Sequence, residues 1–186
     1  MSLSGHGVRV RPLDPDADAD PLREALDHDD VWCHLAGRAH DTASFAAVLR
    51  SRASAGWHQW CVLDDGGRVV GTSSYLEVSV HDARLEVGAT AYARAVWGSH
   101  VNPACKLLLL GYAFDDLRAG RVQLKTDVRN VRSQQAIARL GARPEGVLRR
   151  YQRREDGTVR DTVVFSVTAE DWPDVRAGLL ARLTSG

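Results

Sequence analysis

Alternation of apolar and polar residues predicts a series of short strands, each bounded by turn residues. The strongest signal is a hairpin in which Gln59–Leu63 and Arg68–Tyr75 flank the turn Asp-Asp-Gly-Gly at 64–67. The other predicted strands are Val8–Pro12 at an edge, Arg84–Tyr92, Arg121–Asp127, and a closing hairpin of Ala142–Tyr151 with Asp161–Val167. These strands are numerous enough to build one sheet.

The strand Arg84–Tyr92 has the clearest division into two faces. Strict alternation places Leu85, Val87, Ala89 and Ala91 on one face and Glu86, Gly88, Thr90 and Tyr92 on the other. We expect the first face to lie against the core. Glu86, on the opposite face, is then free to point into a cleft.

Helices are predicted between the strands by apolar residues three to four positions apart. The segment from Pro103 to about Leu117 is apolar almost all round, which is typical of a helix covered on more than one side. Asn130 has the position of an N-cap for a helix that ends at Leu140, before Gly141. Further helices are predicted over Asp16–Leu26, from Thr42 or Ser44 to Arg52, and over Pro173–Leu183. With no repeat or linker, the pattern predicts one α/β domain over residues 1–186.

Composition and charge narrow the possible functions. The chain has 24 basic and 24 acidic residues and no formal net charge, so no global field recruits nucleic acid or an anionic membrane. The apolar run Leu107–Phe114 is far shorter than the roughly 18 residues that span a bilayer. The N-terminus lacks the apolar segment of a secretory signal. We therefore expect a soluble, cytoplasmic protein.

The three cysteines, Cys33, Cys61 and Cys105, are odd in number and widely spaced. This argues against a disulfide framework and against a zinc site. The acidic stretch 27–30, followed by Cys33 and His34, matches no standard metal-site spacing and is interpreted as a solvated helix end. No metal is predicted.

The loop before the apolar helix has the composition of an anion site: Trp97, Gly98, Ser99, His100, Val101 and Asn102, followed by Pro103. Small and polar residues let the backbone approach a ligand, and the start of a helix offers unpaired N–H groups. Pro103 suits the first position of a helix because its missing N–H costs nothing there. The alternative is that Asn102-Pro103 is only a good helix start. On the later helix, Ser133 shares a face with Ile137 and Leu140, so its hydroxyl is expected to point inward.

Taken together, these segments resemble the GNAT superfamily of N-acetyltransferases, in the branch of the ribosomal-protein N-terminal (alanine or serine) acetyltransferases. The resemblance rests on Leu85–Gly88, on the loop and helix from Trp97 to Leu110, on Asp127–Ala142 and on Glu145–Arg149. It implies a mixed, mostly antiparallel twisted sheet of about seven strands with helices on both faces. The loop departs from the family pattern, because His100 and Asn102 stand where small residues are expected.

The resemblance also implies a cosubstrate and site residues. Acetyl-coenzyme A is the expected donor, with its pyrophosphate at the loop and its pantetheine along the open edge of Arg84–Tyr92. A backbone N–H near Ala91 is expected to polarise the acetyl carbonyl. Ser133 would lie near the sulfur and Asn130 would bond the pantetheine amide, unless they only form a helix cap.

Glu86 is the candidate base that deprotonates the amine, directly or through water; the alternative is an ordinary salt-bridged carboxylate. Tyr151 is a weaker candidate acid, and His100 either contacts phosphate or fills space. Direct transfer between two bound reactants is expected. A covalent acyl-enzyme route would need an activated cysteine, and Cys105 has no histidine at helical contact spacing to activate it.

Several alternatives stay open from the sequence. A non-catalytic acyl-coenzyme A sensor or partner domain is a second hypothesis, motivated by the substituted loop. The basic cluster Arg149, Arg150, Arg153 and Arg154 is interpreted as solvated surface, not a nucleic-acid site, or as a group that steers an acidic substrate. The acceptor is a protein N-terminal amine or a small-molecule amine. Its pocket is expected to involve Trp32, His34, Trp57 and Trp60, although aromatic residues there are as easily part of the core. The protein is expected to be a monomer or a homodimer.

Overall fold

The computed structural model describes residues 1–184 and contains one eight-stranded sheet. The strand order is β1-β2-β3-β4-β5-β6-β8-β7, and every neighbouring pair is antiparallel except β5 with β6. The strands are β1 (Leu3–Gly5), β2 (Val8–Pro12), β3 (His58–Asp64), β4 (Val69–Ser79), β5 (Arg84–Tyr92), β6 (Arg121–Asp127), β7 (Arg143–Arg153) and β8 (Val159–Thr168).

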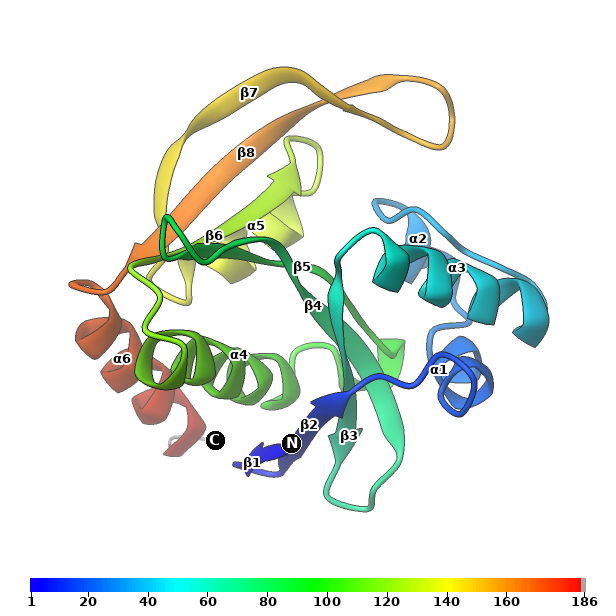
Figure 1. The fold of residues 1–186 in the computed structure, drawn as a ribbon, viewed down its shortest axis with the longest axis horizontal. Helices are drawn as coiled ribbons and strands as arrows, with labels where there is room; N and C mark the ends of the chain where they lie inside the picture. Colours follow the sequence, from blue (N-terminus) through cyan, green and yellow to red (C-terminus); the bar gives the residue numbers. More distant parts are fainter. Residues whose placement is uncertain (185–186) are drawn as a thin grey trace.

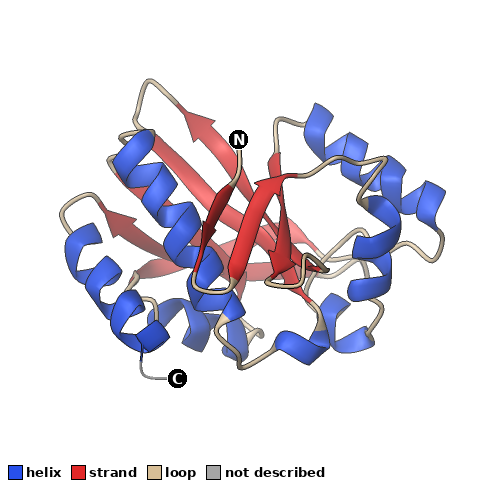
Figure 2. Ribbon diagram, turned by 90° about the horizontal axis from the view of Figure 1, so that it is seen from below, coloured by secondary structure: helices blue, strands red, loops and turns tan. Residues whose placement is uncertain are grey.

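Helices cover both faces of the sheet (Figures 1 and 2). The helices are α1 (Ala19–Ala25), α2 (Asp29–Trp32), α3 (Thr42–Ser54), the 3-10 turn η1 (Arg94–Val96), α4 (Val101–Gly111), the π-helical turn η2 (Tyr112–Asp116), α5 (Val131–Ala138) and α6 (Trp172–Thr184). A large core cluster joins the sheet to α4, α5 and α6, and a smaller one joins it to α1 and α3. Within residues 1–184, no helix has the length and apolar character needed to cross a bilayer.

The predicted α/β fold is confirmed, with local differences. Eight strands stand where about seven were expected, because the three-residue β1 is too short to show a pattern. The helix predicted from Asp16 begins only at Ala19, and the acidic stretch interpreted as a helix end leads into the short helix α2, capped by the His28 imidazole. Helix α4 begins at Val101 and not at Pro103, so the proline lies inside its first turn.

The predicted two faces of β5 are wrong beyond Gly88. Ala89 has a φ of 46°, in the left-handed region, and the register with β4 shifts between Thr72 and Ser74. This β-bulge inserts one residue and exchanges the faces of the residues after it. Leu85 and Val87 lie in the large cluster beneath α4, whereas Ala91 lies in the small cluster beneath α1 and α3.

Strands β5 and β6 separate soon after they begin to pair. Their parallel register covers only Arg84–Glu86 and Arg121–Gln123; beyond it, β5 pairs with β4 alone and β6 with β8 alone. The connection between them runs through α4, and the two strands diverge in Figure 1. The sheet therefore has an opening near its centre, where strand edges keep backbone groups available to a ligand.

Candidate active site

The loop between η1 and α4 presents backbone donors at the start of the helix. Ser99 Oγ donates to Val96 O (2.7 Å) and accepts from Val101 N (3.2 Å), while Ser99 N donates to Val96 O (3.3 Å). Among the described residues, the N–H groups of Gly98, His100 and Asn102 have no hydrogen-bond partner. Three donors and the positive end of the α4 dipole therefore remain for an anion.

The side chains of this loop have structural roles of their own. Gly98 has a φ of 76°, which favours glycine. Val101 is buried in the core, and a Cβ placed on Gly7 would lie 2.8 Å from His100 Nε2, so the imidazole packs against the β1–β2 turn. The predicted anion site thus depends on main-chain groups and not on the histidine ring.

Trp97 connects this loop to both sides of the sheet opening. Its Nε1 donates to Tyr92 O at the end of β5 (2.9 Å). The guanidinium carbons of Arg94 and Arg132 lie 4.6 and 3.5 Å from its ring centroids, at cation–π distance. Because Arg132 belongs to the first turn of α5, one side chain spans from that helix to the loop.

The first turn of α5 holds the predicted pair Asn130 and Ser133. Asn130 Oδ1 accepts from Ser133 N (3.0 Å), which confirms the predicted cap. Ser133 is partly buried, and within residues 1–184 neither its hydroxyl nor the Asn130 amide nitrogen has a hydrogen-bond partner. The cap therefore leaves one hydroxyl and one amide donor for a ligand.

Glu86 lies in a buried ion-pair network on the face of the sheet opposite α4. Only 5% of the residue is exposed, and its carboxylate lies 2.8 Å from Lys125 Nζ. Lys125 also pairs with Glu77 (2.7 Å) and donates to Tyr151 Oη (2.8 Å). Burial raises the pKa of Glu86 above its ordinary value, against the opposing effect of Lys125. Both interpretations made from the sequence are thus compatible with its position: a salt-bridged carboxylate and a group suited to take up a proton.

The position expected for the carbonyl donor needs a correction. Ala93 N donates to Val70 O (2.8 Å), and Ala91 lies opposite Thr72 in the same antiparallel ladder. Antiparallel hydrogen-bonded pairs recur every second residue, so the N–H of Ala91 points toward β4. The alternate residues Thr90 and Tyr92 direct their backbone groups to the open side, in agreement with the Trp97 bond to Tyr92 O. The bulge at Ala89, which the sequence did not reveal, brings these groups to the opening.

The aromatic residues expected around an acceptor divide between core and cavity. Trp60 is buried among Tyr75 and Tyr112 in the large cluster, so it is a core residue. Trp32, with Phe45, Arg52, Ala89 and others, lines a small cavity of about 10 Å³ beside the bulge. Trp57 lies under the guanidinium of Arg52 (5.2 Å). His34 is half-buried, and desolvation lowers its pKa.

Two residues near the opening make contacts that the sequence did not predict. Lys125, the partner of Glu86, lies two positions after Gln123 on β6, and its place on the outward face follows from the buried Val122 and Leu124. Arg154 donates to both oxygens of Asp127 (2.6 and 3.0 Å), so one member of the predicted basic cluster fixes the hairpin to the end of β6. Alternation along β6 was a signal for Lys125, whereas no local pattern pairs Arg154 with Asp127.

Comparisons with known proteins agree with this geometry. The family model "Acetyltransferase (GNAT) domain" matches residues 8–143. A crystal structure from T. thermophilus, assigned as an acetyltransferase, is 40% identical, with a TM-score of 0.90 over 98% of this chain and 97% of that one. N-acetyltransferase p20 of Bacillus licheniformis, itself uncharacterised, is 24% identical over 111 residues, or 60% of this chain. The match spans 61% of that relative's length.

Two solved structures carry names from the branch predicted from the sequence. Mycobacterium smegmatis RimJ, in complex with CoA-disulfide, has a TM-score of 0.78 at 24% identity over 98% of this chain and 93% of that one. The ribosomal-protein-S5-alanine acetyltransferase of Vibrio fischeri has a TM-score of 0.76 at 18% identity, over 92% and 98% of the two chains. At these identities the two structures share the fold. The extent of the family match and the 40% identical structure establish that the chain belongs to the GNAT acetyltransferase family, which confirms the predicted family and the predicted class of enzyme.

Proposed function

We propose that this chain transfers an acetyl group from acetyl-coenzyme A directly to a primary amine. The observation that carries the proposal is the opening between β5 and β6, with three unpartnered N–H groups at one side and the free Ser133 hydroxyl on the first turn of α5, all within residues 1–184. These residues fit a diphosphate followed by a thioester. RimJ, which shares this fold, is in complex with CoA-disulfide, and this supports the choice of carrier.

In this proposal each residue has one task. The N–H groups of Gly98, His100 and Asn102 hold the diphosphate, and Asn130 donates to the pantetheine amide. The N–H of Thr90 or Tyr92 polarises the acetyl carbonyl, in place of Ala91. Glu86, with its raised pKa, takes the proton of the amine directly or through water, and the Ser133 hydroxyl protonates the leaving thiolate. No step is assigned to a metal, and that prediction stays untested.

For the acceptor, we propose a protein N-terminal α-amine as the first candidate, because the Vibrio fischeri enzyme that shares the fold is named for alanine of ribosomal protein S5. Small-molecule amines are the second candidate. The cytoplasmic location, the single domain over residues 1–186 and the choice between monomer and homodimer stay predictions.

The test measures acetyl-coenzyme A binding by calorimetry and coenzyme A release with a panel of peptides and small amines, with acetylated products identified by mass spectrometry. Ser133→Ala is expected to lower kcat by about 100-fold, the usual size of a general-acid effect, with KM for acetyl-coenzyme A unchanged. Ser54→Ala, at the exposed end of α3, is the matched control and is expected to leave both constants unchanged. Tight binding without release on any amine would instead favour the sensor.

A further inference from the structure

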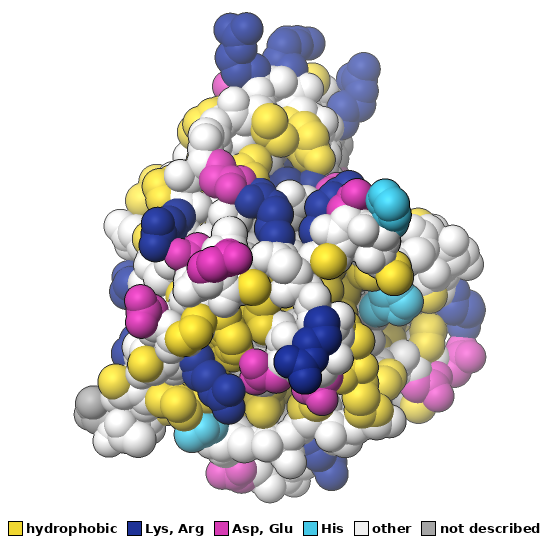
Figure 3. All heavy atoms as spheres, turned by 60° about the vertical axis from the view of Figure 1, so that its left-hand side comes forward, with side chains coloured by type: hydrophobic (Ala, Val, Ile, Leu, Met, Phe, Trp, Pro, Cys, Tyr) yellow, Lys and Arg dark blue, Asp and Glu magenta, His cyan; other side chains and the backbone are white. Residues whose placement is uncertain are grey.

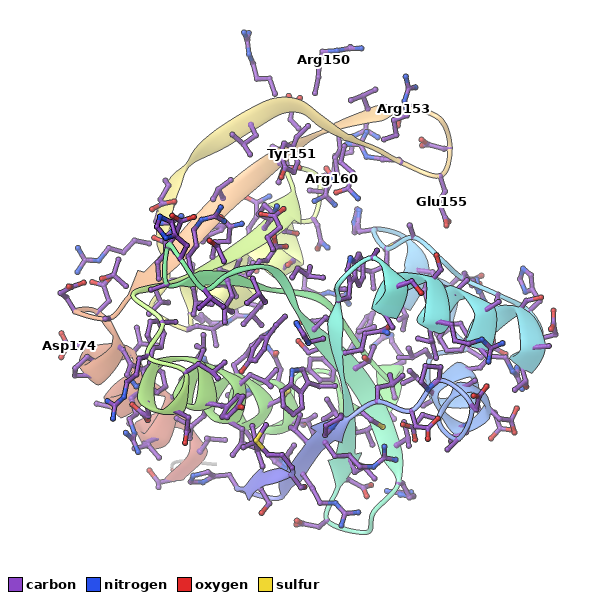
Figure 4. The ribbon with its side chains drawn as sticks, in the orientation of Figure 1. Arg150, Tyr151, Arg153, Glu155, Arg160 and Asp174 are labelled. Carbon is purple, nitrogen blue, oxygen red and sulfur yellow. The ribbon has the colours of Figure 1, made fainter. Side chains whose placement is uncertain are left out.

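Arg160 on β8 lies on the inner side of the arched β7–β8 hairpin. Val163, Phe165 and Val167 face the core beneath α4, so Thr162 and Arg160 face the other way. Arg160 Nε donates to Thr162 Oγ1 (2.9 Å), which fixes it on this face. In Figure 4, Arg160 is drawn inside the arch, whereas Arg150 projects from its outer side. Arg160 therefore lies over the same sheet face as Glu86.

The guanidinium of Arg160 has donors that nothing in the described chain fills. It carries five N–H groups, and its bond to Thr162 is the single hydrogen bond it makes within residues 1–184. The carboxylates that act on it from a distance are occupied: Asp127 binds Arg154 through two bonds, and Glu86 binds Lys125. Arg160 is half-buried, and desolvation lowers its pKa. A partly desolvated cation with unfilled donors is costly to the fold, and an anionic ligand that fills them would offset this cost.

A second cation without an ion-pair partner lies on the facing wall, where Glu155 acts on it from a longer distance. Arg52, in the last turn of α3, lines the cavity beside Ala89, and its Nη2 donates to Ala36 O (2.6 Å). In the described part of the chain no carboxylate lies within ion-pair distance of Arg52. The two walls are joined at the hairpin tip, where Gly37 N donates to Glu155 Oε1 (2.6 Å). The hairpin and α3 thus each carry one cation that has no ion-pair partner in the described chain.

The acidic groups nearest to Arg160 on this face of the sheet are arranged in the opposite way. Glu77 and Glu86 share the single cation Lys125, so the pair keeps an excess negative charge beside the opening. Such a pair attracts an incoming ammonium group, and Arg160 attracts an anion. The charges are complementary to a molecule that carries both.

We propose that the acceptor is an amine with an anionic group close to it, a carboxylate or a phosphate, and that Arg160 binds this group while Arg52 adds positive charge from the other wall. The proposal rests on the proposed acetyl transfer and names its substrate class. A guanidinium binds either oxyanion through two parallel N–H groups, which the free edge of Arg160 offers. Basic side chains also project at the hairpin end of the molecule (Figure 3), but those of the outer side are solvated and are not part of this site.

The experiment uses acceptor pairs that differ in one charge. Peptides with an N-terminal alanine followed by glutamate or glutamine, and by phosphoserine or serine, distinguish a carboxylate from a phosphate. Small amines in the same pairing, glycine against glycinamide, extend the panel. We expect the acidic member to have a kcat/KM about tenfold higher or more, in keeping with a charge-assisted bidentate contact.

Arg160→Gln is expected to remove this preference, by raising KM for the acidic member about tenfold or more, while the neutral member and the KM for acetyl-coenzyme A stay unchanged. Arg160→Lys keeps the charge but loses the paired N–H groups of the guanidinium. Its preference for the acidic member is expected to lie between those of the wild type and Arg160→Gln. Arg153→Gln removes the same charge from the exposed part of the hairpin and is the matched control. Thermal unfolding of each variant verifies that it is folded.

Equal rates on both members of every pair would overturn this inference and leave acetyl transfer intact. An equal loss on acidic and neutral members in Arg160→Gln would also overturn it, since that result indicates a structural role. Failure of every amine to release coenzyme A would remove the inference and the proposed function together.

Discussion

Lys106 is a buried cation on the most apolar helix of the protein. The residue is 5% exposed, and its Nζ donates to Thr90 Oγ1 (2.9 Å), which in turn contacts Ser73 Oγ (2.8 Å). No carboxylate within residues 1–184 pairs with it. Desolvation lowers the pKa of Lys106 to about 8, so burial of this amine opposes folding at neutral pH.

Lys106→Met should raise the free energy of unfolding at pH 7. The lowered pKa corresponds to about 3 kcal/mol at 1.4 kcal/mol per pKa unit, less the lost bond to Thr90. Between pH 8 and about 10 the unfolded wild-type chain keeps the proton that the folded chain has lost, so wild-type stability gains on the variant as pH rises. Urea unfolding of both proteins from pH 7 to 10 measures the difference. Parallel pH curves would show that Lys106 is not desolvated as described.

The raised pKa of Glu86 makes its role testable through the pH dependence of the rate. If it is the base, it must be ionised, so kcat/KM should rise with pH through a pKa above 4.5, the direction that burial imposes. Glu86→Gln should abolish this limb and lower kcat/KM by about 100-fold. The comparison variant is Glu77→Gln, which removes the other carboxylate from Lys125 and should keep the rising limb of the pH profile. Equal losses in the two variants would assign Glu86 a role in the ion pair alone.

Site features that depend on neighbouring residues could be predicted from the sequence, whereas those that depend on contacts between strands could not. The Asn130 cap joins residues only three positions apart, Asn130 and Ser133, and it was predicted correctly. The donor assigned to Ala91 was wrong because the bulge at Ala89 arises from pairing with β4, which alternation along β5 does not record. Most of the strand that carries Arg160 was predicted. The unfilled donors of Arg160 were not, because they result from Arg154 and Lys125 occupying the nearby carboxylates of Asp127 and Glu86.

At the scale of elements, the pairing of β4 with the bulged β5 depends on Gly71. A Cβ at this position would lie 2.4 Å from Ala91 O and 2.6 Å from Tyr92 Cδ1. The close approach of the two strands excludes a side chain here, so Gly71 fixes the segment of β5 that carries the open backbone groups.

Gly71→Ala is therefore expected to destabilise the protein by about 2 kcal/mol or more, because backbone must move to relieve the clash. It should also weaken acetyl-coenzyme A binding, since the strand edge that we propose for the pantetheine would shift. Gly178→Ala is the control: its Cβ meets nothing within 4 Å, and alanine in a helix should stabilise by about 0.5–1 kcal/mol. Chemical unfolding and calorimetry of both variants measure the effects; unchanged stability in Gly71→Ala would contradict the close approach.

Most elements could be predicted from the sequence, but their ends and registers could not. The hairpin of β3 and β4 is defined by its turn residues, yet β4 continues to Ser79 because it pairs with β5. The start of α4 was placed at Pro103, whereas the Ser99 hydroxyl accepts from the N–H of Val101, where the helix begins. Local propensity thus located the helix, and a side-chain hydrogen bond set its first turn.

For the whole molecule, sheet order explains why the site lies where it does. The β5–β6 pair is the one parallel pair of the eight-stranded sheet in residues 1–184; the chain leaves β5, forms the loop and α4, and returns in β6. The connection therefore puts the start of α4 beside the gap that the strands leave as they separate. No local pattern encodes strand order, and the family resemblance implied only a mixed, mostly antiparallel sheet of about seven strands.

In the proposed function, the free amides at the start of α4 bind the diphosphate of the acyl carrier. A titration of the ¹⁵N-labelled protein with coenzyme A, in which the amide proton chemical shifts are measured by NMR, tests this binding mode. We expect large downfield shifts for Gly98, His100 and Asn102, whose N–H groups are free among the described residues, and small ones for Ser99 and Val101, whose N–H groups are already bonded. Saturable binding that leaves Gly98, His100 and Asn102 unshifted, and moves amides elsewhere, would contradict it.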